Sequence, residues 1–161
     1  MTLLVEDGTG LVGAEVYDTT AACAAWLAKR GHAAFPDSSA ADQERALLKA
    51  TEAAERSVGN VIGGVKVRAT QGLLLPRTGI YDRSGNYLGH AIPERYRHGI
   101  FLLAEAERQG QLEQPSVAAS QALKAASAGG MRLEFREPES KPLRERHPEA
   151  WALLSSVVGG G

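Results

Sequence analysis

Alanine is the feature of this sequence that most constrains its fold. It supplies 26 of the 161 residues, whereas Leu, Ile, Val and Phe together supply only 35. A chain of about 150 residues usually buries roughly 70% of its unfolded surface, but alanine brings little apolar area to a core at about 25 cal/mol per Å². Close packing of long helices through alanine, or burial against other subunits, must supply the remaining buried apolar surface. The sequence therefore predicts a mainly helical domain with a thin core.

Charge and hydropathy exclude several classes of protein. Eighteen Lys and Arg against nineteen Asp and Glu give a net charge of -1, the wrong sign for a protein that binds nucleic acid chiefly by neutralising phosphates, unless a local basic patch does so. No apolar run approaches the roughly 20 residues of a membrane span, and the acidic start does not resemble a secretory signal. The single cysteine, Cys23, cannot form an internal disulfide. We therefore expect a soluble protein made in a reducing cytoplasm.

Capping residues and apolar spacing predict four helices. The first covers residues 21–30 after the N-cap oxygens of residues 18–20, and the second runs from Ser38 or Ser39 to about residue 57. Pro93 is expected at the first position of the third helix, which ends before Gly110, and Pro148 opens the last. The expected core comprises Leu47, Ala50, Ala54, Ile100 and Leu103.

The predicted organisation has three parts. Residues 1–17 form an extended arm, because short apolar runs alternate with glycines there. Residues 18–110 form the helical core, which includes a region of short strands and loops at residues 59–91. Residues 111–161 form a C-terminal extension with a strand at about 131–137 and a short helix at about 148–158. The fold class is mainly α with a short β-hairpin.

Residues 8–13, with the sequence GTGLVG, match the glycine spacing of a dinucleotide-binding loop, and Asp37 follows at a suitable distance. Two features oppose that interpretation. Glu6 and Asp7 stand where the pyrophosphate would arrive, and the expected helix begins too late for its N-terminus to meet the phosphates. A flexible glycine-containing arm is the favoured alternative.

The residues that most often carry chemistry are not arranged for it. The four histidines, His32, His90, His98 and His147, lack metal-binding spacing. Cys23 has no nearby basic residue and is expected to be a small buried hydrophobe. No nucleophile elbow accompanies the serines. We therefore expect no metal, no cofactor and no enzyme activity.

Basic and aromatic residues are interleaved in the central part of the chain. The set is Lys66, Arg68, Arg77, Arg83, Arg95 and Arg97 with Tyr81, Tyr87 and Tyr96. A single-strand-binding surface uses such residues for phosphate pairing and base stacking. Protein interfaces are enriched in the same residue types. The sequence leaves both interpretations open.

Several segments resemble the DnaT-like single-stranded-DNA-binding proteins found in tailed phages and prophages. The similar residues are 6–10 (EDGTG), Gly13, Ala14 and Tyr17, residues 30–31 (RG), 69–73 (ATQGL), 76–79 (PRTG) and 92–93 (IP). Leu75 stands where that family commonly has a tryptophan. The order of elements is also similar to that of phage head-to-tail adaptor proteins, which form a ring beneath the portal.

The adaptor resemblance implies a structural protein of the virion neck. Its partners would be further copies of itself in a ring, which is usually twelve-fold in such proteins, the portal, and the next neck or tail-completion protein. Packaged DNA would pass through the ring without sequence readout. Expected interface residues are Leu11, Val12, Val16, Arg77, Tyr81, Arg83, Tyr87 and Trp151, with the three arm residues exposed in an isolated chain.

The alternative function is single-stranded DNA binding in phage replication. Its expected DNA contacts are Arg68, Arg77, Tyr81, Arg83 and Arg97. The two hypotheses share the segment around Arg77 and Tyr81, so the surroundings of these side chains bear on both.

Overall fold

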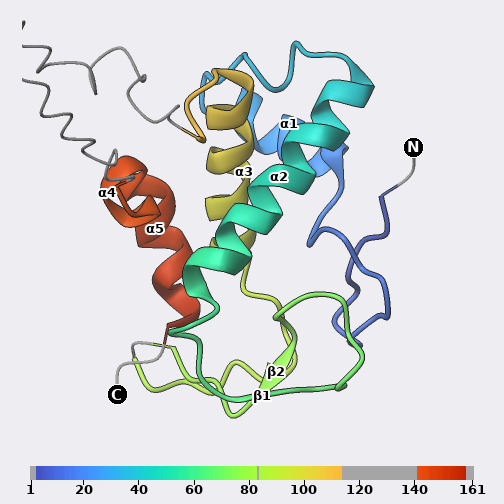
Figure 1. The fold of residues 1–161 in the computed structure, drawn as a ribbon, viewed down its shortest axis with the longest axis vertical. Coiled ribbons are helices and arrows are strands. Elements are labelled where there is room, and N and C mark those ends of the chain that lie inside the picture. The colour runs from blue at the N-terminus through green and yellow to red at the C-terminus, as the bar shows by residue number, and fades with distance from the viewer. Residues whose placement is uncertain (1–2, 83, 114–140, 159–161) are drawn as a thin grey trace, which may run out of the picture.

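A computed structural model describes residues 3–82, 84–113 and 141–158, and its fold is mainly helical with one small hairpin. The elements are α1 (Thr20–Ala28), α2 (Ala40–Val58), β1 (Val65–Lys66), β2 (Arg77–Thr78), α3 (Glu94–Arg108), α4 (Leu143–Arg146), α5 (Pro148–Leu154) and the 3₁₀ turn η1 (Ser155–Val157). Figure 1 shows the helices above a layer of loops that contains β1 and β2. The expected fold class is confirmed.

Side-chain caps begin the first two helices where the sequence places them. The Thr19 hydroxyl accepts a hydrogen bond from the Ala22 amide at 3.1 Å, and the Ser39 hydroxyl accepts one from the Asp42 amide at 3.2 Å. Pro93 precedes α3 as its N-cap instead of occupying its first position. Helix α4 was not expected, because Leu143 is the only apolar residue in a charged segment. Burial of Leu143 against the rest of the fold stabilises this short helix, although the local sequence lacks the apolar spacing that would predict one.

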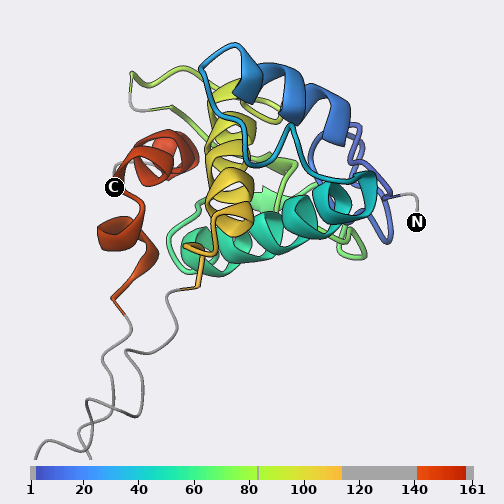
Figure 2. The same cartoon turned by 90° about the horizontal axis from the view of Figure 1, so that it is seen from above.

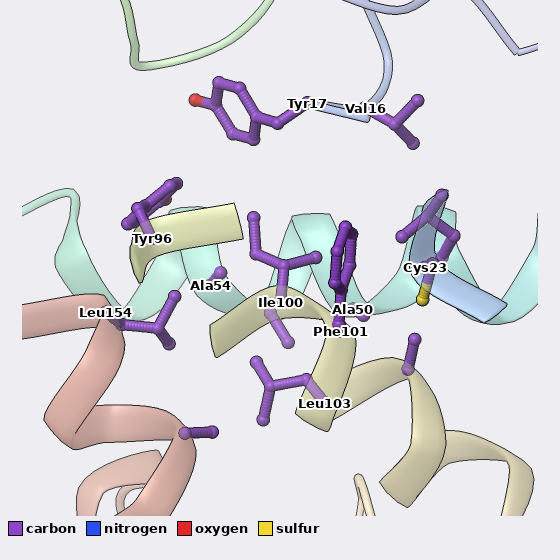
Figure 3. Packing of buried hydrophobic residues seen from close by; sticks show 14 of the residues in the cluster. Val16, Tyr17, Cys23, Ala50, Ala54, Tyr96, Ile100, Phe101, Leu103 and Leu154 are labelled. Atoms are coloured by element: carbon purple, nitrogen blue, oxygen red, sulfur yellow. The ribbon is translucent and has the colours of Figure 1, made fainter. Parts of the chain in front are cut away.

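Helices α2 and α3 form the centre of the core through small side chains on one helix and large ones on the other. Ala50 and Ala54 of α2 face the region of Ile100 and Leu103 of α3 (Figure 3), and all four side chains are buried. Alanine lets the helix axes approach closely, so the large side chains of α3 fill the space between them. The core predicted from helical periodicity is confirmed.

Helix α5 packs on another side of α3 (Figure 2) through a glycine. A Cβ atom placed on Gly99 would lie 2.9 Å from two carbons of Leu154 and 3.1 Å from the Ala150 carbonyl oxygen. Close approach of the two helices therefore requires glycine at this position. No helix in the described parts of the chain is long and apolar enough to cross a membrane.

The first segment (residues 3–17) is extended, but it folds onto its own chain. Val16 is fully buried beside Tyr17, Leu11 is partly buried, and only Val12, at 65% exposure, is exposed as expected. The expectation that all three arm residues are exposed in an isolated chain is wrong. A parallel bridge between Val5 and Val16 turns the segment back on itself, so intramolecular packing covers its apolar side.

The loop layer (residues 59–82 and 84–91) contains the expected short strands. β1 and β2 are antiparallel, with Val65 opposite Thr78 and Lys66 opposite Arg77. A further antiparallel bridge joins Tyr81 to Tyr87. The predicted strand at about 131–137 lies outside the described residues.

Candidate nucleic-acid interface

Tyr81 and Tyr87 form a pair of rings on the surface of the loop layer. Their centroids are 5.5 Å apart and their planes are inclined by 51°. They are 53% and 54% exposed, and no other aromatic side chain in the described parts of the chain is more than half exposed. Each ring therefore keeps apolar surface in water that a flat partner can cover.

Asp82 holds the turn that carries this tyrosine pair. Its carboxylate accepts hydrogen bonds from the amides of Ser84 and Asn86, each at 2.8 Å, and from the Asn86 side-chain amide at 2.9 Å. The bonds from Asn86 are the main reason that the pKa of Asp82 is lowered. The turn is thus held by its own polar groups, which leaves both rings free for a partner.

Lys66 and Arg68 are the cations of the loop layer whose side chains make no ion pair or hydrogen bond within the described residues. Lys66 lies in β1, opposite Arg77 in β2, and Arg68 follows β1 by two residues. Arg68 is exposed and Lys66 is partly exposed. The charge of Lys66 acts on Glu55 and that of Arg68 on Asp7, but neither cation is within ion-pair distance of a carboxylate among the described residues, so both can still contact an anionic partner. Arg68 was an expected DNA contact, whereas Lys66 was predicted only as a member of the wider basic and aromatic set.

Arg77 makes hydrogen bonds within the loop layer, and its predicted contact with DNA or a protein partner stays a prediction. Its Nε donates to the Gly63 carbonyl and its Nη2 to the Gly64 carbonyl, each at 2.7 Å. The guanidinium therefore links β2 to the two glycines that precede β1. Arg77 organises the surface, and much of its donor capacity is already used within the protein.

Arg97 and Tyr96 of α3 already have partners within the fold. The Arg97 guanidinium donates to the Asp18 carboxylate at 2.9 Å and lines a pocket of about 470 Å³ together with Glu6 and Asp7. Tyr96 is fully buried, with its ring 5.3 Å from that of Tyr17. The carboxylates of this pocket disfavour a phosphate beside Arg97, and its predicted DNA contact stays a prediction.

The other expected interface residues lie in several places. Trp151 is partly buried on α5 and packs against the core. Arg83 lies outside the described residues. Leu11 and Val16 contribute to the core instead of a free surface. Whether any of these residues meets a partner stays a prediction.

The glycines of residues 8–13 do not form a phosphate loop. The buried Glu6 carboxylate accepts hydrogen bonds from the amides of Gly8, Gly10 and Leu11 at 2.9–3.0 Å. These amides are the donors that a pyrophosphate would need. Helix α1 begins only at Thr20, so its N-terminus lies well beyond the glycines. The protein's own carboxylate occupies the position of the supposed ligand.

A buried polar contact fastens the loop layer to α2. The Tyr17 hydroxyl donates to the Glu55 carboxylate and accepts a hydrogen bond from the Leu75 amide at 2.9 Å, while Glu55 also accepts from the Leu74 amide at 2.8 Å. Burial raises the pKa of Glu55, and the hydrogen bonds from Tyr17 and Leu74 oppose that shift. Leu75 itself is 1% exposed. An aromatic residue at this position would therefore lie in the core, away from any base.

Other chemistry finds little support among the described residues. Cys23 is fully buried, as expected, and burial raises its pKa, which disfavours the reactive thiolate. No group of three or more His, Cys, Asp or Glu side chains in the described residues is placed to hold a metal ion.

Residues 1–161 match a family model described as "Putative DnaT-like ssDNA binding protein". The comparisons with curated proteins and with solved structures gave no match. The family description overturns the head-to-tail adaptor interpretation, because it names a single-strand binder and no finding indicates a connector. The predicted ring, portal and tail-completion partners, and the passage of packaged DNA without sequence readout, are corrected with it. The chain belongs to the DnaT-like single-stranded-DNA-binding family.

Proposed function

We propose that this protein binds single-stranded DNA through the loop layer, with the tyrosine pair stacking on bases and Lys66 and Arg68 contacting phosphates. The exposed tyrosine pair is the observation that carries the proposal. The family description supports the same ligand.

Stacking supplies most of the affinity in this proposal. A base that covers a half-exposed tyrosine removes apolar surface from water on both partners, which is worth about 1–3 kcal/mol per base. Because the Asp82 turn already holds the rings, little ordering cost opposes binding. The two rings are inclined to each other, so each offers its outer face to a different base.

The same geometry favours single strands over duplexes. The faces of bases inside a duplex are covered by their neighbours, whereas an unpaired strand can present a face to each ring. Every base has such a face, so binding is expected to be tolerant of sequence. Two phosphate contacts predict a salt slope of only about -1.4, at about -0.7 per contact.

Fluorescence anisotropy with a labelled oligonucleotide tests the proposal. Wild type should bind an unpaired oligothymidine more tightly than a duplex of equal length. Tyr81→Ala should weaken binding roughly 5- to 150-fold, which corresponds to the loss of one stacked base. Tyr81→Phe should retain most of the affinity, because the ring remains.

Matched cation variants separate specific from general charge effects. Lys66→Ala should lower both affinity and salt slope. Lys29→Ala removes an equally unpaired cation at the end of α1 and should change neither. Equal binding by wild type and Tyr81→Ala would contradict the stacking site, and absence of binding at low salt would contradict the function.

The catalytic inactivity and the location of the protein are also proposed. We propose a binding protein without catalytic activity, because the proposed ligand is held by stacking and charge alone. Synthesis in the bacterial cytoplasm and a location in the virion stay predictions, to be checked by fractionating infected cells and purified particles.

A further inference from the structure

Gln71 is a buried side chain with three hydrogen bonds, all to the main chain of the loop layer. Its Oε1 accepts from the Arg68 amide at 3.0 Å, and its Nε2 donates to the carbonyls of Leu73 and Pro76 at 2.9 and 3.0 Å. The Gln71 amide also donates to the Arg68 carbonyl at 3.3 Å. With 4% exposure, Gln71 closes a tight loop whose first residue is an unpaired cation.

Residues 10–14 of the first segment pack against this loop and form the surface on which it rests, which we call the seat. A Cβ on Gly10 would lie 3.2 Å from Gln71 Oε1 and 3.4 Å from Arg68 Cγ, so the stem of Arg68 packs against the glycine backbone. On the next residue, the Gly72 amide donates to the Leu11 carbonyl at 3.0 Å. A Cβ on Gly72 would lie 2.5 Å from the Ala14 carbonyl oxygen. Gln71 and the first segment therefore fix the loop from two sides. The Arg68 side chain is the part of this loop that is exposed to solvent.

Building on the proposed function, we propose that Gln71 is a positioning residue of the single-strand site and acts through Arg68. By fixing the Arg68 backbone, with Arg68 Cβ and Cγ against Gly10, it sets the position and direction from which the guanidinium reaches a phosphate. A long charged side chain loses conformational freedom on binding, and this seat removes part of that loss in advance. Gln71 itself is buried and does not touch DNA.

A double-mutant cycle tests the mechanism with anisotropy titrations of oligothymidine over a range of salt concentrations. Gln71→Met retains the length of the side chain but removes its three hydrogen bonds. It should reduce affinity no more than Arg68→Ala does, and should lower the salt slope by up to about 0.7, the value of one phosphate contact. In the Arg68→Ala background, Gln71→Met should cause no further loss.

Gly10→Ala is the second variant, because it disturbs the seat without removing a buried polar group. Gly10→Ala should change DNA affinity and salt slope as Gln71→Met does, both in wild type and in the Arg68→Ala background. The matched control is Gln43→Met, because the Gln43 side chain likewise bonds to three main-chain groups, here carbonyls of the connection that precedes α2. The control should lower thermal stability and leave DNA affinity unchanged.

The outcomes distinguish the two proposals. An unchanged affinity in Gln71→Met, or an equal loss in the presence and absence of Arg68, would overturn the positioning role while leaving the stacking site intact. Wild-type affinity in Arg68→Ala would do the same. Absence of oligonucleotide binding by wild type would overturn the proposed function and this inference together.

Discussion

The helical layer (α1, α2, α3 and α5) and the loop layer are held together by different forces. Between α2 and α3 the contacts are apolar, with alanines of one helix opposite large side chains of the other. In the loop layer, Gln71 and Arg77 bond to main-chain groups, and Glu55 and Tyr17 fasten the layer from outside. Packing stabilises the first layer, whereas specific polar contacts fix the shape of the second.

This difference explains how a thin core can support a binding surface. Loops expose many main-chain donors and acceptors, and each one that is buried without a partner costs about 1–3 kcal/mol. Buried polar side chains satisfy these groups and set the loop geometry at the same time. The apolar core then needs only to hold the helices on which the loop layer rests.

The largest expected effect comes from the helical layer. Leu103→Ala should lower the free energy of unfolding by about 2–5 kcal/mol, because a fully buried side chain leaves a cavity. Denaturant unfolding followed by far-UV circular dichroism measures the change. If the loss were below about 1 kcal/mol, the helical layer would not depend on packing as the comparison requires.

An intermediate effect is expected at the contact between the layers. Glu55→Ala should lower the free energy of unfolding by about 1–3 kcal/mol, because the Leu74 amide loses its partner. Glu55→Gln should lose less, since its single amide oxygen can replace one of the two carboxylate acceptors. Comparing the two variants by chemical denaturation measures how much one acceptor contributes. Equal losses in both would show that one acceptor is not enough and that both carboxylate oxygens are required.

The raised pKa of Glu55 adds a prediction on pH. Because the folded carboxyl holds its proton more firmly than the unfolded one, the associated stabilisation is complete below the unfolded pKa of about 4.5 and is lost as pH rises through the folded value. The stability of wild type relative to Glu55→Gln should therefore fall as pH rises above about 4.5. A difference that rises with pH would contradict burial as the dominant cause.

The smallest effect on stability is expected at the exposed turn. Asp82→Ala should leave the thermal midpoint nearly unchanged, since solvent can replace the hydrogen bonds of the carboxylate. It should still weaken binding of oligothymidine, because the tyrosine pair loses the turn that holds it. A variant that binds as well as wild type would show that the rings need no such support.

Local sequence signals predicted the helices better than they predicted the site. The Thr19 and Ser39 caps and the apolar spacing of α2 depend on neighbouring residues only, so they are readable in the sequence. The intramolecular contacts of Arg77 and Arg97 could not be foreseen, because their partners, Gly63, Gly64 and Asp18, lie 13 to 79 residues away. An exposed cation and a paired one look the same in a sequence.

The sequence by itself determined a mainly helical chain with alanine-lined packing and a central region of short strands. It also carried the family resemblance that the match over residues 1–161 confirms. Only the tertiary structure decided that the first segment closes on its own chain, that Glu6 fills the glycine loop, and which cations stay free. The physical reason is that pairing of charges and polar groups depends on contacts between distant segments, whereas helix formation depends on contacts within a few residues.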